Sequence, residues 1–192
     1  MGALATLHRQ GKALYVGISS YSAQLTRKAA AILATENVPL LIHQPAYSML
    51  NRWIETELLD TLDELGTGCI AFSVMGQGLL TDKYLDGIPA DARAARDGSL
   101  SAALITDNNI ERIHALNSIA ERRGQTLGQM AIAWALRDPR VSSALLGART
   151  VEQLIESLAS LDNLPFSDEE LTEIDAYASD GDIDIWNASS QL

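Results

Sequence analysis

The sequence predicts an α/β fold in which parallel strands alternate with helices. Short apolar runs, each closed by polar, Gly or Pro residues, indicate strands at residues 13–19, 38–43, 69–74 and 141–146. A stretch with helical spacing of apolar residues follows each run. Strands that alternate with helices pair in parallel through right-handed crossovers. A doubly wound sheet and half of an eight-stranded (β/α)₈ barrel both fit this order.

The last of these units is the clearest. Residues 141–146 predict a buried strand that ends at Gly147, and Thr150 begins a helix, with Gln153 at capping-box spacing. The expected apolar face of this helix consists of Val151, Leu154, Ile155 and Leu158. Arg149 lies just before the helix, whose amino end offers unpaired N–H groups. The turn therefore suits a phosphate group, although an ordinary strand–helix connection has the same sequence features.

Capping residues and breakers place the other helices. They are expected at residues 23–36, 51–65, 107–123 and 126–137 and from residue 167 onward, and the first ten residues resemble the end of a helix. The expected caps of the second and third are Asn51 and either Asp107 or Asn108, and Ser167 with Glu170 has capping-box spacing. A long loop is expected over residues 76–106.

Composition excludes several classes of function. The formal net charge of −11 disfavours non-specific binding to nucleic acid or to anionic membranes. The single cysteine, Cys69, allows no intrachain disulfide, which suits a reducing compartment. The sequence contains no apolar run long enough to span a bilayer and no pattern typical of a signal peptide. We therefore expect a cytoplasmic protein.

Candidate binding residues follow the expected strands, because ligands of parallel α/β folds bind at the carboxyl ends of the strands. They are Ser19, Ser20 and Tyr21; Gln44, Pro45, Ala46 and Tyr47; Phe72, Ser73, Val74, Met75 and Gly76; and Gly147, Ala148 and Arg149. This set suits a planar polar ring and a phosphate, and the loop cations Lys83 and Arg93 suit a pyrophosphate or a sugar phosphate.

Other reactive residue types have simpler interpretations. His43 lies one position before Gln44, so we expect its side chain to face the helix layer and to be structural. Cys69 has no base near it in the sequence, which favours a buried, unreactive thiol. No His, Cys or carboxylate spacing is typical of a metal site.

Four segments together resemble a known family. GKALYVGIS, HQPAYSMLNRW, AFSVMGQGLLTDKYLDGIP and LGQMAIAWALRDPRVSSALLGARTVEQLIESL, in this order, resemble the carboxyl-terminal half of the aldo-keto reductases. The bacterial glyceraldehyde 3-phosphate reductase branch, related to potassium-channel beta subunits, is the most similar, and the tail IDIWNASS resembles it too. The resemblance implies one domain, residues 1–192, that forms strands five to eight of a (β/α)₈ barrel.

The resemblance also implies a cofactor and its contacts. NADPH would lie across the carboxyl-terminal mouth of the barrel and reduce small aldehydes such as glyceraldehyde 3-phosphate or methylglyoxal. Ser19, Ser20 and Gln44 would bond the nicotinamide carboxamide, and Phe72 would stack on the ring. The other implied contacts are Ser73, Val74, Met75, Gly76, Gly78, Lys83 and Arg93 at the pyrophosphate and Gly147, Arg149, Gln153 and Glu156 toward the adenosine and its 2′-phosphate.

Three departures from the family pattern matter. Val74 stands where the family often has Pro, and Ser157 stands where it often has Asn. No residue here matches the catalytic Asp, Tyr, Lys and His of the family, which belong to the first half of its barrel. We therefore expect a cofactor-binding half without the proton donor, either as part of a reductase or as a non-catalytic half-barrel.

A half-barrel would have two unprotected edge strands and an uncovered inner face. By simple strand alternation the inner face would include Tyr15, Leu40, Ile42, Ile70 and Leu145. Exposing such side chains forfeits roughly 1.5–3 kcal/mol each. We therefore expect a homo-oligomer, or association with a separate first half.

Overall fold

The computed structural model describes residues 1–82, 85, 106–179, 181 and 183. Its strands are β1 (Val16–Ser19), β2 (Leu40–Gln44), β3 (Gly68–Phe72) and β4 (Val141–Leu145). Its α-helices are α1 (Gly2–Arg9), α2 (Ala23–Thr35), α3 (Leu58–Leu65), α4 (Asp107–Arg122), α5 (Leu127–Ala135), α6 (Val151–Leu158) and α7 (Asp168–Asp175). Short 3₁₀ helices are η1 (Trp53–Glu55), η2 (Gly76–Gly78) and η6 (Ala159–Asn163). Within the described residues the predicted order of strands and helices is confirmed. Most of the loop expected at residues 76–106 lies outside them.

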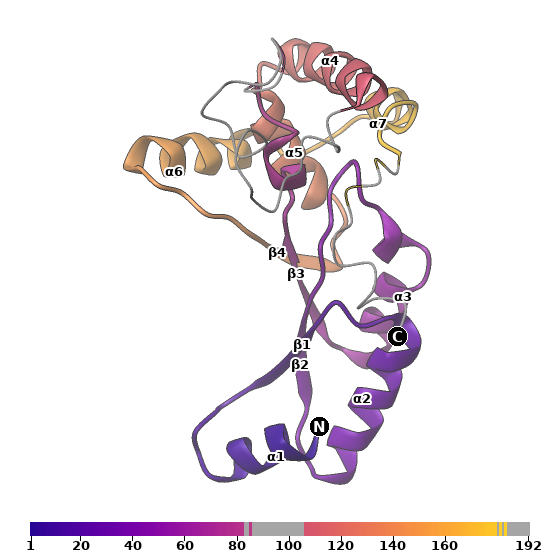
Figure 1. Cartoon of the computed structure of the whole chain (residues 1–192), viewed down its shortest axis with the longest axis vertical. Coiled ribbons are helices and arrows are strands. Elements are labelled where there is room, and N and C mark those ends of the chain that lie inside the picture. Colours follow the sequence, from indigo (N-terminus) through magenta and orange to yellow (C-terminus); the bar gives the residue numbers. More distant parts are fainter. Residues whose placement is uncertain (83–84, 86–105, 180, 182, 184–192) are drawn as a thin grey trace.

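The four strands form one parallel sheet in the order β1-β2-β3-β4. This is the arrangement of four consecutive β/α units of a partial (β/α)₈ barrel, and it confirms the predicted fold class. Figure 1 shows α2 and α3 beside the sheet and α6 set apart from it, at the end of a long segment after β4.

One face of the sheet is buried beneath helices. A smaller core joins β1 and β2 to α1 and α2, and a larger core joins β3 and β4 to α3, α4 and α5. His43 lies on this face and is fully buried, which confirms the prediction that it points to the helix layer. Trp134, in α5, is also fully buried.

The opposite face is open, but its membership differs from the prediction at Leu40 and Tyr15. Ile42 and Ile70 are half-buried on this face and Leu145 is exposed, as expected. Leu40 was wrongly predicted there, because it is 8% exposed and packs in the smaller core. The register shifts so that Leu40 pairs with Val16 and Ile42 with Gly17, and the extra residue between them reverses the alternation. Tyr15 is exposed but precedes β1.

Two glycines allow Ile42 to lie across the open face. A Cβ atom on Gly17 would stand 2.5 Å from Ile42 Cγ2, and one on Gly68 would stand 2.7 Å from Ile42 Cδ1. Both distances are too short for a side chain. The glycines of β1 and β3 thus make room for one branched side chain from the strand between them.

The strand predicted to be buried at residues 141–146 is largely exposed, and the helix that follows it is exposed too. Only Val141 is buried in β4, and none of the residues of α6 is buried. The apolar stripe of α6 is exposed at Val151 (67%), Leu154 (47%), Ile155 (62%) and Leu158 (53%). The amphipathic pattern is present as predicted, but β4 is an edge strand of the described sheet. Among the described residues, α6 packs mainly against α5 and η6.

Helix caps follow the predictions in part. Ser167 and Glu170 form the complete capping box. Thr106, rather than Asp107 or Asn108, caps α4 through the N–H of Asn109. Asn51 caps no helix, because its backbone pairs with Ser48.

Candidate cofactor-binding site

The carboxyl ends of β1 and β2 bring three predicted residues together. Ser19 pairs with Gln44 in the sheet, and Ser19 Oγ donates to the Gln44 carbonyl oxygen at 2.7 Å. The Ser20 N–H donates to the same oxygen at 3.3 Å, and the Oγ atoms of Ser19 and Ser20 are 3.5 Å apart. Ser20 has a positive φ of 55°, which turns the chain away from the strand at this point.

Phe72 ends β3 beside this group. Its N–H donates to the Pro45 carbonyl at 3.0 Å, and its own carbonyl accepts from the Tyr47 N–H at 3.0 Å. The half-buried Phe72 side chain alternates with buried Ala71, so it lies on the open face. The Phe72 ring and the side chains of Gln44 and Ser19 therefore lie on the open face, at the carboxyl ends of three adjacent strands.

The chain turns sharply after Phe72. Ser73 has a φ of 57° and Gln77 a φ of 60°, both in the left-handed region. Ser73 accepts through its carbonyl from Gly76 N–H at 2.8 Å and through Oγ from Gln77 N–H at 3.2 Å, and Gly78 N–H donates to the Met75 carbonyl at 2.9 Å. The shape of the turn is thus set by its own hydrogen bonds.

Two residues of this turn leave little room for side-chain contact with a ligand. Val74 is 1% exposed and belongs to the larger core, and Gly76 is also buried. Any contact of Val74 with a cofactor would use its backbone. Ser73, Met75 and Gly78 are half-buried and remain compatible with the implied contacts.

The segment after β4 forms its own small group. Thr150 caps α6 by accepting from Gln153 N–H at 3.3 Å, and Gln153 Oε1 accepts from the backbone N–H of Arg149 at 2.9 Å. Gln153 thus reaches the residue before the cap, so a strict capping box does not form. Gly147, Arg149, Gln153 and Glu156 are all exposed. Lys83 and Arg93 lie outside the described residues.

Two titratable side chains near the strands are chemically quiet. Burial lowers the pKa of His43 to about 4, although Nε2 lies 3.1 Å from the Tyr21 carbonyl oxygen, which raises it. Burial, with a smaller contribution from Asp138, raises the pKa of the Cys69 thiol to about 12. Cys69 is therefore a protonated thiol in the core, as the sequence predicted.

A cluster of charged and aromatic side chains was not predicted. Tyr47 follows β2, Glu55 lies in η1 and Arg137 follows α5, and the three side chains share hydrogen bonds. Hydrogen bonds from Arg52, Tyr47 and Arg137 outweigh the effect of burial and lower the pKa of Glu55. A charged residue directly after the apolar run of α5 was the only hint in the sequence.

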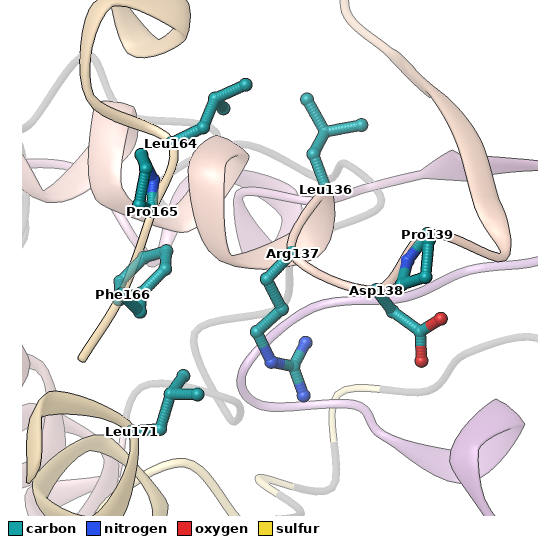
Figure 2. A pocket seen from close by; sticks show the side chains of 8 residues that line it. All are labelled: Leu136, Arg137, Asp138, Pro139, Leu164, Pro165, Phe166 and Leu171. Atoms are coloured by element: carbon teal, nitrogen blue, oxygen red, sulfur yellow. The ribbon is translucent and has the colours of Figure 1, made fainter. Parts of the chain in front are cut away.

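A surface hollow lies at the other end of β4. Its volume is about 520 Å³, and Figure 2 shows the side chains that line it. They are Leu136, Arg137, Asp138, Pro139, Leu164, Pro165, Phe166 and Leu171. Asp138 and Pro139 directly precede β4, so the hollow is at the amino end of this strand and is separate from the candidate site.

Among the described residues, no group of three or more His, Cys, Asp or Glu side chains is suited to a metal ion. Among the same residues, no helix has both the length and the apolar character needed to cross a bilayer.

Comparison with known families decides what this arrangement belongs to. Residues 1–179 match the model of the Aldo/keto reductase family. The chain belongs to the aldo/keto reductase family. This confirms the resemblance inferred from the four segments of the sequence.

Individual aldo/keto reductase relatives agree. The L-glyceraldehyde 3-phosphate reductases of Escherichia coli O157:H7 and of Escherichia coli strain K12 are each 50% identical over 193 residues, which cover 98% of this chain and 56% of theirs. A probable voltage-gated potassium channel subunit beta of Oryza sativa subsp. japonica is 33% identical over 168 residues, covering 85% of this chain and 51% of its own. The chain spans about half the length of the curated relatives it matches.

Proposed function

We propose that this chain is the cofactor-binding half of an NADPH-dependent aldo-keto reductase that reduces small aldehydes or ketones, with glyceraldehyde 3-phosphate or methylglyoxal as representative substrates. The observation that carries the proposal is the grouping of Ser19, Gln44 and Phe72 on three adjacent strand ends. Similarity to reductases named for L-glyceraldehyde 3-phosphate supports the substrate class. The single buried thiol and the acidic net charge suit a cytoplasmic enzyme that binds neither nucleic acid nor membranes.

The geometry fits a nicotinamide. A flat ring needs an aromatic face to stack on and polar groups at its edge for the carboxamide, and Phe72 with Gln44 and Ser19 supplies both. NADPH, when bound, supplies the hydride. The protein's part here is to hold the ring at a fixed place and angle relative to the substrate, which lowers the barrier by orientation.

The remaining contacts are proposed at the ends of the cofactor. Arg149 and the amino end of α6 lie where a 2′-phosphate would meet a positive charge and a helix dipole. The turn from Ser73 to Gly78 would run along the pyrophosphate. The general acid that protonates the carbonyl oxygen is assigned to no residue of this chain, because the family's catalytic Asp, Tyr, Lys and His have no match here.

NADPH binding tests the proposal. We expect saturable binding of NADPH to the purified chain by fluorescence titration, and Phe72→Ala to weaken it about three- to tenfold, since an aromatic stack contributes about 0.5–1.5 kcal/mol. Phe166→Ala is the matched control. It removes the other phenylalanine, whose ring centre lies 3.7 Å from Arg123 Cζ and which lines the separate hollow. Equal losses in both variants, or the absence of saturable binding, would refute the proposed site.

Turnover separates binding from catalysis. We expect the 192-residue chain to bind NADPH without oxidising it in the presence of an aldehyde panel. Saturable oxidation of NADPH by this chain alone would show that a proton donor lies within it.

A second candidate function is a non-catalytic half-barrel that associates with a copy of itself or with a separate first half. The observations that favour it are the exposed apolar stripe of α6 and, separately, the exposed Leu145 of edge strand β4. Surfaces of this kind mark protein–protein contacts. This role is compatible with the reductase proposal if the partner supplies the other four strands.

A further inference from the structure

The last residue of β2 and the short segment after it, residues 44–47, join the side chains on which the proposed nicotinamide site depends. The Gln44 carbonyl accepts from Ser19 Oγ at 2.7 Å. The Pro45 carbonyl accepts from Phe72 N–H at 3.0 Å, and the Phe72 carbonyl accepts from Tyr47 N–H at 3.0 Å. Both backbone groups of Phe72 are therefore held by this segment, and any shift of the segment moves the ring.

The segment is anchored through the side chain of Tyr47. The Tyr47 ring is 1% exposed, and its hydroxyl donates to Glu55 Oε1 at 2.5 Å and accepts from Arg137 Nη1 at 2.7 Å. Arg137 Nη2 also donates to Glu55 Oε1 at 2.9 Å. Burial raises the pKa of Tyr47, so its hydroxyl keeps the proton that it donates.

Neighbouring contacts make this anchor stiff. The Arg137 guanidinium lies 3.6 Å from the centre of the Trp134 ring, and the Tyr47 ring is 5.2 Å from the same ring. Trp53 Nε1 donates to the Ala46 carbonyl at 3.0 Å, between the two points where the segment holds Phe72. The segment is therefore tied to η1 by Trp53 and by the Tyr47 hydroxyl, and the hydroxyl also ties it to Arg137 in the turn before β4.

We propose that Tyr47 is a positioning residue for the cofactor: through Glu55 and Arg137 it fixes the backbone of residues 45–47 and thereby the angle of the Phe72 ring against the nicotinamide. The inference rests on the proposed function. Tyr47 itself lies on the helix side and does not touch the cofactor. Its effect is confined to the nicotinamide end, because the Arg149 and Gln153 contacts belong to a different strand–helix turn.

Tyr47→Phe tests the proposal because it removes only the hydroxyl. The control is Tyr177→Phe, at an exposed tyrosine that follows α7. Two ligands are titrated into each purified chain: NADPH, and 2′,5′-ADP, which carries the adenosine end without nicotinamide. We expect Tyr47→Phe to weaken NADPH about three- to tenfold, the effect of losing one hydrogen bond. We expect 2′,5′-ADP to bind Tyr47→Phe as tightly as it binds the unmodified chain.

A readout without ligand gives an independent check. The chain has only two phenylalanines, Phe72 and Phe166, so labelling with 4-fluorophenylalanine gives two ¹⁹F resonances. Glu55→Gln weakens the anchor without adding a phenylalanine. We expect the Phe72 resonance to shift or broaden and the Phe166 resonance to stay unchanged.

The outcomes separate the two proposals. If the unmodified chain binds NADPH and Tyr47→Phe binds it equally well, the positioning role is overturned and the proposed function stands. If Tyr47→Phe weakens NADPH and 2′,5′-ADP alike, the residue acts only on general stability and the positioning role is again overturned. If the unmodified chain binds neither ligand, the proposed function fails and the positioning role fails with it.

Discussion

Lowering the pH from 8 to 5 should destabilise the fold through His43. The imidazole is fully buried, and burial lowers its pKa from 6.5 to about 4. Its Nδ1 atom meets no hydrogen-bond partner among the described residues. The neutral ring can leave that nitrogen unprotonated and donate from Nε2 to the Tyr21 carbonyl. Protonation would bury a second N–H donor with nothing to accept it.

The direction and size of the effect follow from this difference in pKa. Below pH 6.5 the unfolded chain gains a proton at residue 43, while the folded chain does not gain it until the pH approaches 4. The stabilisation by neutral His43 is therefore complete above pH 6.5 and is lost as the pH falls toward 4. At pH 5 the loss comes to about 2 kcal/mol. The total free energy of unfolding of a typical domain is about 5–15 kcal/mol.

Urea denaturation at pH 8 and pH 5 measures this loss. His43→Gln is the control variant, because an amide can keep the bond to Tyr21 and does not titrate. The ion pairs and the other two histidines are common to both proteins, so the difference between their losses isolates His43. We expect the unmodified chain to lose about 2 kcal/mol more than the variant. Equal losses would show that His43 titrates in the folded protein with an ordinary pKa.

Two further predictions concern the open face and its edge. Gly68→Ala should lower the free energy of unfolding, measured by urea denaturation, by about 1–3 kcal/mol, because the new Cβ would stand 2.7 Å from Ile42 Cδ1. Adding Ile42→Val deletes Cδ1 and should recover most of this loss. If the double variant is no more stable than Gly68→Ala, the strain does not come from Ile42 Cδ1. Replacing Leu154 and Ile155 with Lys should reduce self-association measured by light scattering, because these exposed side chains belong to the apolar stripe of α6. The control, Glu152→Lys on the same helix, changes charge without removing apolar surface and should leave self-association in place. A monomeric unmodified chain with a sharp thermal transition would contradict the association argument.

The order of elements could be predicted because its signals are local. Apolar runs, Gly and Pro breakers and capping residues act within a few positions, and the Ser167 box illustrates this. Asn51 was misjudged for the same reason: its type suits a cap, but the backbone there pairs with Ser48 instead. Alternation failed at Leu40, because one extra residue in β2 reverses the faces and has no distinct sequence signature.

Burial and long-range contacts lay beyond the sequence. The apolar pattern of residues 141–158 correctly gave β4 and α6, but burial depends on what lies beside them, and the described part of the chain leaves both largely exposed. The strand-end residues Ser19, Gln44 and Phe72 could be grouped from parallel topology alone. The Tyr47 anchor could not, since Arg137 is 90 residues away along the chain.

The parallel order of the sheet also sets the sequence in which the strands can assemble. Val16 pairs with Leu40 and Ile42 with Gly68, whereas Cys69 pairs with Val141 across a far longer stretch of chain. Closing that longer loop costs about 1 kcal/mol more in chain entropy than closing either of the others. The first three strands can therefore form a folding nucleus through short β/α crossovers, and β4 joins it last. Because β4 buries only Val141, we expect its backbone hydrogen bonds to open first, as fast amide hydrogen exchange in this strand would show.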